Sequence, residues 1–388
     1  MIMKKFFKSF ITSLMIGIPV VILVCVFLYM NKDIEDSNAF QEESVYISDS
    51  TDVFDDSTEK TEHVDISNDE DVSESAETTA SVTLSFAGDV HFSELVLQNY
   101  DKNGILAIVD DEMLSQMQNS DLFMLNHEFV FSNRGEAMED KEYTLRNDPK
   151  YVKILQELGT DVVGVANNHI LDFGQEAFVD TLDTLENANI PYVGGGKNIS
   201  EASSPVVQTI NGHTFAIFAA TRVSPSADWY AGKNHPGILQ TYDATTLDKA
   251  IEDANSKYDH IIVFVHWGVE RVEIPEDYQR TLAKGYIDAG ADLILGAHPH
   301  VLQGFEYYKG VPICYSLGNY LFGNRTGDTL LLNATFDSDD ELSIQLIPCK
   351  RIDGILTKIQ DSAELFNHLT DISFGAAVSH VGTLIESK

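Results

Sequence analysis

Residues 294–303, ILGAHPHVLQ, place His298 and His300 one residue apart, directly after an apolar run. The run is short and aliphatic, which predicts a buried β-strand over residues 293–295. On its own, such a pair of loop histidines is explained better by hydrogen bonds to the backbone than by a bound ligand. What the two imidazoles do therefore depends on which other side chains the fold brings beside them.

The alternation of short apolar runs with longer amphipathic stretches predicts the fold class. Apolar runs predict further strands over 82–87, 122–125, 162–165 and 261–265. Amphipathic stretches predict helices over 148–159, 174–188, 243–256 and 276–289. Beyond residue 305, acidic turns separate strand-like runs, which is typical of antiparallel strands, over 311–315, 330–336 and 342–348. The chain is therefore predicted to adopt an α/β layered fold.

Each of the main predicted strands ends in side chains that can bind metal ions. These are Asp89 and His91 after the first strand, Glu128 after the second, Asn168 after the third, His266 after the fourth, and His298 and His300 after the fifth. The carboxyl ends of strands in an open α/β sheet meet at one edge, where ligands bind. We therefore expect these side chains to pool into one site.

The donor set of this expected site suits two divalent transition-metal ions, with Mn, Fe or Zn as the candidates. Carboxylate, amide and imidazole donors without a thiolate favour these ions over a sulfur-bound site. The three cysteines, Cys25, Cys314 and Cys349, form no zinc-type cluster. Two neighbouring ions can activate a water molecule and stabilise the charge that builds on an attacked phosphorus or carbonyl centre.

Five stretches of the chain resemble signatures of the calcineurin-like metallophosphoesterases, and more narrowly of their CapA branch. They are FAGDV (86–90), ANNHILDFG (166–174), FVHWGVE (264–270), GAHPHVLQGFE (296–306) and YSLGNYLF (315–322). The resemblance implies a calcineurin-like layered α/β sandwich. It also implies a role in the synthesis or export of poly-γ-glutamate capsule, through a membrane-anchored extracytoplasmic domain.

The resemblance also implies roles for individual residues. One metal ion would be held by Asp89, His91, Glu128 and His300. The other would be held by Glu128, Asn168, His266 and His298, with Glu128 as the bridge. His169 corresponds to the histidine that protonates a leaving group in active phosphoesterases, and Asp172 would orient it. Glu306, which follows a histidine motif, is either a group that orients an imidazole or contacts substrate, or a surface carboxylate.

The second motif departs from the phosphoesterase pattern. That pattern has Gly-Asp-x-x-Asp, whereas this chain has Leu125-Asn126-His127-Glu128. The longer glutamate leaves open whether both metal positions fill and whether phosphate esters are turned over. His127 is expected to point to the other side of the chain from Glu128.

The N-terminal region predicts a membrane anchor followed by a linker. Residues 10–30 contain no charged side chain and are long enough to cross a bilayer as a helix. Lysines precede this run, which favours a cytoplasmic N-terminus, and no small-residue site ends it, which disfavours a cleaved signal peptide. Residues 33–80 hold 17 acidic side chains against one lysine and predict a disordered tether. The expected organisation is a single-pass plasma-membrane anchor at 1–32, a linker at 33–80, an extracytoplasmic domain at 81–350 and a tail at 351–388.

The chain has a formal net charge of −36, which argues against nucleic acid as a partner. Poly-γ-glutamate is the anionic polymer that the resemblance implies as a partner, together with membrane subunits of a capsule synthase or exporter. Three functions stay open at this point. The chain is a metal-dependent hydrolase or transferase that acts on the polymer, a non-catalytic scaffold of the synthase complex, or an orphan metal-dependent phosphoesterase of the cell envelope.

Overall fold

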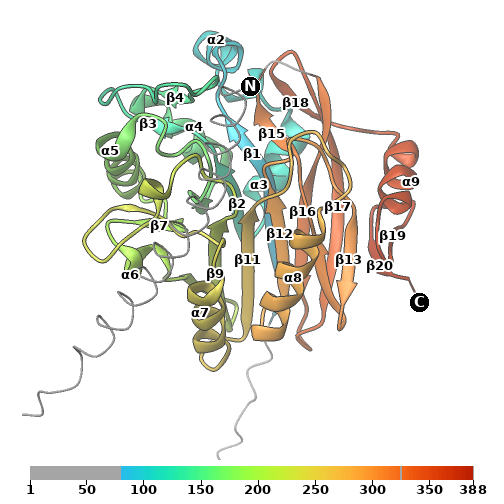
Figure 1. The fold of residues 1–388 in the computed structure, drawn as a ribbon. Helices are drawn as coiled ribbons and strands as arrows, with labels where there is room; N and C mark the ends of the chain where they lie inside the picture. Colours follow the sequence, from blue (N-terminus) through green and yellow to red (C-terminus); the bar gives the residue numbers. More distant parts are fainter. Residues whose placement is uncertain (1–79, 324–325, 388) are drawn as a thin grey trace, which may run out of the picture. The chain divides into compact units, whose positions relative to one another are not determined.

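Most of the predicted strands and helices form within residues 80–323 and 326–387, which the computed structural model describes (Figure 1). The predicted anchor at 1–32 and the predicted linker up to residue 79 lie outside these residues. Over the described ranges, no helix is both long enough and apolar enough to span a membrane. The elements form a sheet-rich mixture of strands and helices, which confirms the predicted α/β class.

The larger sheet has β1 near its centre. Its strands are β1 (Val82–His91), β2 (Leu122–His127), β5 (Val162–Gly164), β6 (Tyr192–Val193), β15 (Asn319–Phe322), β16 (Gly327–Phe336), β17 (Leu342–Ile352) and β18 (Ile355–Lys358). The order is β18–β17–β16–β1–β2–β5–β6, and β15 also pairs with β1. β2 runs parallel to β1, whereas β16 and β17 form the antiparallel pair that the sequence predicts.

The smaller sheet is mostly parallel. Its strands are β8 (Val206–Ile210), β9 (His213–Thr221), β11 (His260–His266), β12 (Leu293–Ala297), β13 (Phe305–Tyr308) and β14 (Val311–Cys314), in the order β13–β14–β12–β11–β9–β8. The sequence prediction omitted β9, although its apolar run resembles that of β11. The prediction of antiparallel pairing was only partly right for β14, because this strand is antiparallel to β13 but parallel to β12.

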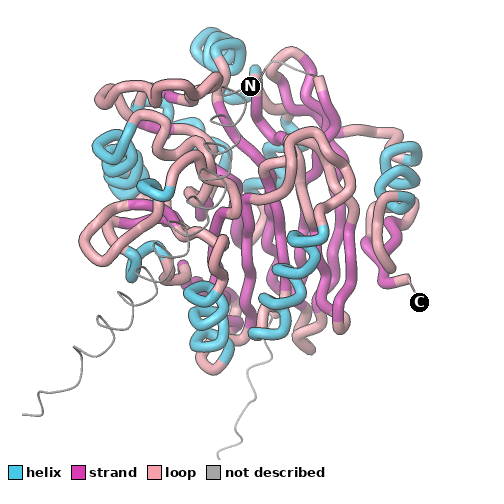
Figure 2. Tube along the Cα trace, viewed as in Figure 1, coloured by secondary structure: helices cyan, strands magenta, loops and turns pink. Residues whose placement is uncertain are grey.

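In the described residues, the helices flank the strands of the two main sheets, as Figure 2 shows. They are α2 (Glu94–Asn103), α3 (Asp111–Gln118), α4 (Val152–Leu158), α5 (Gly174–Asn187), α6 (Ile199–Ala202), α7 (Thr245–Asn255), α8 (Asp277–Ala289) and α9 (Ala363–Asp371). The four predicted helices correspond to α4, α5, α7 and α8. α8 begins at a reciprocal cap between Glu276 and Gln279 and ends at Gly290, whose φ of 119° is left-handed.

Short elements complete the described chain. Three pairs of short strands form small sheets, namely β3 (Val130–Phe131) with β4 (Arg146–Asn147), β7 (Gly195–Gly196) with β10 (Gly237–Ile238), and β19 (Ala376–Val378) with β20 (Leu384–Glu386). Single turns of 3₁₀-helix span Ile105–Ala107, Pro149–Tyr151 and Ala227–Trp229.

Strand β11 shows how the smaller sheet packs on both of its faces. Ile261 and Val263 belong to an apolar cluster that they share with α7 and α8. Ile262 and Phe264 belong to the cluster that also contains the core of the larger sheet. Because side chains alternate along a strand, His266 continues the second series. The alternation of side chains along β11 therefore points His266 toward the larger sheet.

Glu306 in β13 holds a charged cluster together and does not contact the site histidines through any described hydrogen bond. Its carboxylate accepts hydrogen bonds from Arg280 Nε at 2.8 Å and from the Tyr315 hydroxyl at 2.8 Å, and it pairs with Lys284 Nζ at 2.8 Å. Burial alone would raise the pKa of Glu306, but these bonds outweigh burial and lower the pKa to about 2. The carboxylate is therefore ionised at neutral pH and structural in role.

Replacing Glu306 with glutamine should lower the free energy of unfolding by about 2 kcal/mol at pH 7. The pKa in the folded state lies below the ordinary value of 4.5. The contribution of Glu306 is therefore complete above pH 4.5 and is lost as the pH falls toward 2. Chemical denaturation of full-length wild type and of Glu306→Gln should show that the difference in their free energies of unfolding shrinks as the pH falls. A Glu341→Gln control should match wild type. A difference that stays constant between pH 7 and pH 3 would contradict the assignment.

Candidate metal centre

The predicted ligands come from two sheets whose carboxyl ends meet, and not from the single sheet edge that we expected. Asp89 lies in β1 and Glu128 follows β2, both in the larger sheet. His266 is the last residue of β11 in the smaller sheet, and His298 and His300 lie in the loop after β12. The fold therefore brings together side chains that are up to about 200 residues apart in the chain, as the bond between His298 and Asp89 illustrates.

Asp89 is fully buried and accepts hydrogen bonds from both sheets. Its Oδ1 accepts from Asn126 Nδ2 at 2.7 Å, and its Oδ2 accepts from the backbone N–H of His298 at 3.1 Å. The same Oδ2 lies 3.3 Å from His300 Nδ1. Burial alone would raise the pKa of Asp89, but the hydrogen bond and charge of His300 outweigh it and lower the pKa. Asp89 is therefore an ionised acceptor at the junction of the sheets.

A glycine beside Asp89 lets a second loop reach the backbone of β1. A Cβ atom on Gly88 would lie 1.9 Å from the carbonyl oxygen of Gly318, so no side chain fits there. The backbone N–H of Asp89 donates to that same oxygen at 2.9 Å. The pairing of β1 with β15 shifts register between Asp89 and Val90. The contact between the two glycines therefore helps to fix where the Asp89 carboxylate lies.

Glu128 is a buried carboxylate that no hydrogen-bond donor in the described part of the chain satisfies. Its side chain is fully buried, and neither of its oxygens has a partner among the described residues. Its Oε1 lies 3.5 Å from His266 Nε2. Burial, and next the negative charge of Asp89, raise the pKa of Glu128 well above its ordinary value. A cation at this position would satisfy both oxygens.

His266 and His298 face the same space as Glu128. His266 Nε2 lies 2.8 Å from Asn168 Oδ1, and the ring centroids of His266 and His298 are 4.8 Å apart. His298 Nδ1 is buried and has no hydrogen-bond partner in the described chain. Burial, and next the charge of His300, lower the pKa of His298 to about 3. Its ring is therefore neutral near neutral pH, which is the form that binds metals.

His300 is oriented by a residue that sequence reasoning gave no role. Its Nδ1 lies 2.7 Å from Oδ1 of Asn319, which belongs to the stretch YSLGNYLF. Both His298 and His300 have left-handed backbones, with φ of 98° and 59°. Such conformations cost a non-glycine residue of the order of 1–3 kcal/mol and concentrate at functional sites. The loop therefore holds its two imidazoles in place at the expense of backbone strain.

The ring of His91 lies among aromatic side chains. Its centroid is 5.8 Å from that of Phe129 and 5.5 Å from that of Phe322. It belongs to none of the groups of clustered donor atoms in the described residues. Burial, and next the charge of His169, lower the pKa of His91 to about 3. Its assignment as a ligand therefore stays a prediction from the resemblance.

His169 and Asp172 form a hydrogen-bonded pair next to Asn168. His169 Nδ1 lies 2.7 Å from Asp172 Oδ2, and Asp172 is fully buried. A carboxylate can only accept, so Nδ1 carries the proton and Nε2 carries the free electron pair of the neutral ring. Burial lowers the pKa of His169, which favours this neutral form. The predicted orienting contact between the two residues is present.

Lys141 joins this pair, and sequence reasoning missed it. Its Nζ contacts Asp172 Oδ1 and the carbonyl oxygen of Asn168, and lies 3.1 Å from His169 Nδ1. The ammonium also lies over the ring of Trp229, at 5.3 Å from its centroid. Lys141 occupies a loop without periodic apolar residues, so no local pattern marks it.

His127 lies away from the cluster, as strand alternation predicts. Its ring packs 3.9 Å from that of Phe129 and 4.9 Å from that of Phe131, between centroids. It is absent from every group of clustered donor atoms over the described residues. The side chain is therefore part of the core.

The donor atoms clustered at the junction of the two sheets fall into two groups that fit metal ions. One consists of Glu128, His266 and His298, and the other of Asp89, Glu128 and His300. Within each group the ligand atoms lie within 4.8 Å of one another. A buried polar atom without a partner costs about 1–3 kcal/mol, and Glu128 contributes two such atoms. The residues therefore fit a metal centre in which Glu128 belongs to both groups.

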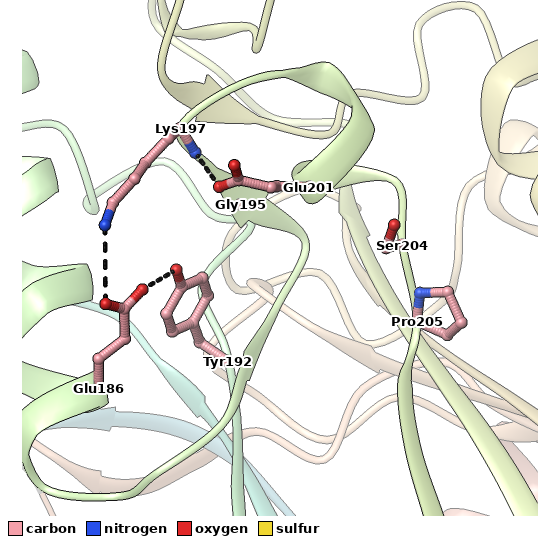
Figure 3. A pocket seen from close by; sticks show the side chains of 7 residues that line it. All are labelled: Glu186, Tyr192, Gly195, Lys197, Glu201, Ser204 and Pro205. Carbon is pink, nitrogen blue, oxygen red and sulfur yellow. Dashed lines mark hydrogen bonds and ion pairs between the residues drawn. The ribbon is translucent and has the colours of Figure 1, made fainter.

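The open surface pocket drawn in Figure 3 is separate from this cluster and shares no residue with it. Its carboxylates are already paired, since Glu186 accepts from the Tyr192 hydroxyl at 2.7 Å and Glu201 accepts from the backbone N–H of Lys197 at 2.8 Å. The pocket gives no second candidate for the site.

Comparison with known proteins agrees with the motifs. The profile of the family described as "Bacterial capsule synthesis protein PGA_cap" matches residues 83–324. The PGA biosynthesis protein CapA of Bacillus subtilis (strain 168) is 34% identical over 65% of this chain and 67% of its own length. The capsule biosynthesis protein CapA of Bacillus anthracis is 31% identical over 79% of this chain and 77% of its own length.

A more distant relative has a related name. A probable polyglutamine synthesis accessory protein of Mycobacterium tuberculosis (strain ATCC 25618 / H37Rv) is 30% identical over 54% of this chain and 58% of its own length. The matched region of the family profile contains every residue of the two donor groups. The chain therefore belongs to the CapA-type family of bacterial capsule synthesis proteins.

Proposed function

We propose that this chain acts in the synthesis or export of poly-γ-glutamate capsule, and that its clustered donors form a dinuclear metal centre. The observation that carries the second part is Glu128, a fully buried carboxylate that belongs to both donor groups and has no hydrogen-bond donor among the described residues. The family membership and the names of the Bacillus relatives support the first part.

The proposed ligands follow the roles that the resemblance implies. Asp89, His91, Glu128 and His300 would hold one ion, and Glu128, Asn168, His266 and His298 the other. Mn, Fe or Zn suits this set of oxygen and nitrogen donors. Such a pair of ions would supply an activated water and stabilise the negative charge that develops on the attacked centre.

The residues around the centre would hold and move protons. The bond to Asp172 fixes the tautomer of His169, which leaves Nε2 as the atom that exchanges a proton with the reacting group. Lys141 holds the Asp172 carboxylate and the Asn168 carbonyl oxygen together. It would act as a positioning residue, because it reaches the site through these two groups.

We also propose the placement of the chain at the membrane. The uncharged run at 10–30 supports an N-terminal anchor with a cytoplasmic N-terminus, and the acidic composition of 33–80 supports an extended linker. The described residues would then form an extracytoplasmic domain with a calcineurin-like layered sandwich. Their two sheets share one apolar cluster, and α7 and α8 cover the other face of the smaller sheet, which supports that layering.

A scaffold role is the second candidate, and the net charge of the chain favours it. A strongly acidic protein repels an anionic polymer unless bound metal or local lysines intervene. In that case the anchor would gather synthase and export subunits, and the metal centre would serve stability. Cleavage of another extracytoplasmic phosphodiester is the remaining alternative.

The variant Asp89→Asn separates these functions in a polymer-producing host whose own copy of the gene is deleted. Loss of the Asp89 carboxylate should lower polymer yield at least tenfold, because the group formed by Asp89, Glu128 and His300 would lose charge that holds metal. Asp371→Asn, an exposed change in α9, is the control. Normal yield with folded Asp89→Asn protein would support the scaffold, whereas deletion of residues 1–32 should abolish yield under either function.

A further inference from the structure

A second group of metal-type donors lies at the opposite end of β11 from the candidate metal centre. His260 is the first residue of β11 and His266 is the last. Six residues of extended strand, at about 3.3 Å each, separate them by about 20 Å. His213 begins the neighbouring strand β9, and Asp340 lies in the turn between β16 and β17. This group is therefore independent of the centre described above.

The three ligand atoms form a nearly regular triangle. His213 Nδ1 lies 3.2 Å from His260 Nε2 and 3.1 Å from Asp340 Oδ1, and His260 Nε2 lies 3.5 Å from Asp340 Oδ1. In a tetrahedral zinc site with bonds of about 2.0–2.1 Å, neighbouring ligand atoms are about 3.3–3.4 Å apart. The three observed distances scatter around this value.

The hydrogen-bond partner of His213 leaves the required nitrogen free. His213 Nε2 lies 3.2 Å from the carbonyl oxygen of Ala80, which can only accept, so Nε2 carries the proton. In the neutral ring the electron pair is then on Nδ1, the atom that faces His260 and Asp340. A backbone carbonyl that binds the far nitrogen in this way is typical of metal-bound histidine.

Packing fixes the second imidazole. The ring centroid of His260 is 5.0 Å from that of Phe215 and 4.1 Å from that of Phe336. Burial lowers the pKa of His260, so its ring is neutral near neutral pH and able to bind a metal. The two imidazoles are buried, whereas the Asp340 side chain is 66% exposed. Solvent therefore reaches the triangle from the side of the turn.

We propose that His213, His260 and Asp340 bind one divalent transition-metal ion, with zinc as the best fit. Two nitrogen donors and one carboxylate suit zinc, and three protein ligands leave a fourth position for water. The ion would join β9 and β11 of the smaller sheet to the β16–β17 turn of the larger sheet. Its role is to stabilise the end of the two sheets that lies away from the candidate metal centre.

Zinc binding to the full-length protein in detergent tests this site. After removal of metal with EDTA, His260→Gln should bind one Zn²⁺ ion fewer per chain than wild type. Asp340→Asn should bind that ion at least tenfold more weakly, and both variants should lose most of the zinc-dependent rise in Tm. Asp339→Asn, in the same turn but outside the triangle, is the matched control and should behave as wild type.

A His298→Ala background separates this site from the candidate metal centre. Loss of one zinc ion on adding His260→Gln should persist in that background, even if the centre binds no metal at all. Circular dichroism confirms folding, and Asp340→Asn changes only an exposed turn. Equal zinc content and an equal rise in Tm for wild type, His260→Gln and Asp340→Asn would overturn the proposal. In that case His213 and His260 form only a hydrogen-bonded pair.

Discussion

Replacing Glu128 with glutamine should make the metal-free protein more stable and at the same time remove its metal affinity. The wild-type carboxylate is fully buried beside Asp89 and has no hydrogen-bond partner in the described chain. Burial, and next the negative charge of Asp89, raise the pKa of this carboxyl well above its ordinary value, so keeping it ionised or protonating it near neutral pH is costly. A neutral amide of the same shape avoids this cost and should raise the free energy of unfolding by about 1–2 kcal/mol. The same change removes the carboxylate that belongs to both donor groups, and affinity for Mn²⁺ or Zn²⁺ should fall by about a hundredfold or more.

The opposite signs of these two effects make the test specific. Chemical denaturation of full-length protein, with EDTA and with added Mn²⁺, measures both. Glu306→Gln is the matched control, because it makes the same chemical change at a carboxylate with four recorded hydrogen-bond or ion-pair contacts and should destabilise with or without metal. If Glu128→Gln destabilised the metal-free protein as much as Glu306→Gln does, Glu128 would have a partner in the protein itself and the case for a metal would weaken.

The sequence predicted the secondary structure well where the pattern of apolar residues lies within a single strand. The run at 261–265 predicts β11, and alternation along that strand explains why His266 faces the larger sheet. The assignment of strands to two sheets was not predictable in the same way. Pairing is a property of residues far apart in the chain, and nothing in the run before His298 shows which strands lie beside it.

The same contrast holds for the site, where motifs were predictable from the sequence but contacts between distant residues were not. Motif order grouped Asp89, Glu128 and the loop histidines, and the fold brings their donor atoms close together. Lys141 was missed because it lies in an irregular loop, 28 residues before His169, and gains its contacts only in the folded chain. The triangle at Asp340 was missed for a similar reason, since the acidic turn was interpreted only as a connection between strands.

Replacing His169 with glutamine should lower turnover by about 10²- to 10⁴-fold, the range that a positioned proton-transfer group contributes. This prediction rests on the proposed hydrolytic function. Glutamine is close in size but has no ring nitrogen that can exchange a proton, whereas metal content should stay at the wild-type level. The measurement is kcat and KM of the metal-loaded, full-length protein with two substrates, a chromogenic phosphodiester and poly-γ-glutamate.

Lys141→Met extends this test to the positioning contacts. Removal of the ammonium frees the Asp172 carboxylate and the Asn168 carbonyl oxygen, so kcat should fall about tenfold or more while KM changes little. Lys257→Met, at an exposed lysine, is the control and should leave both constants unchanged. Because Lys141 acts through Asp172, adding Lys141→Met to Asp172→Asn should cost less than the product of the two single effects. Full turnover by His169→Gln would contradict its role in proton transfer. If wild-type protein turned over neither substrate, the scaffold would be the function that the family membership supports.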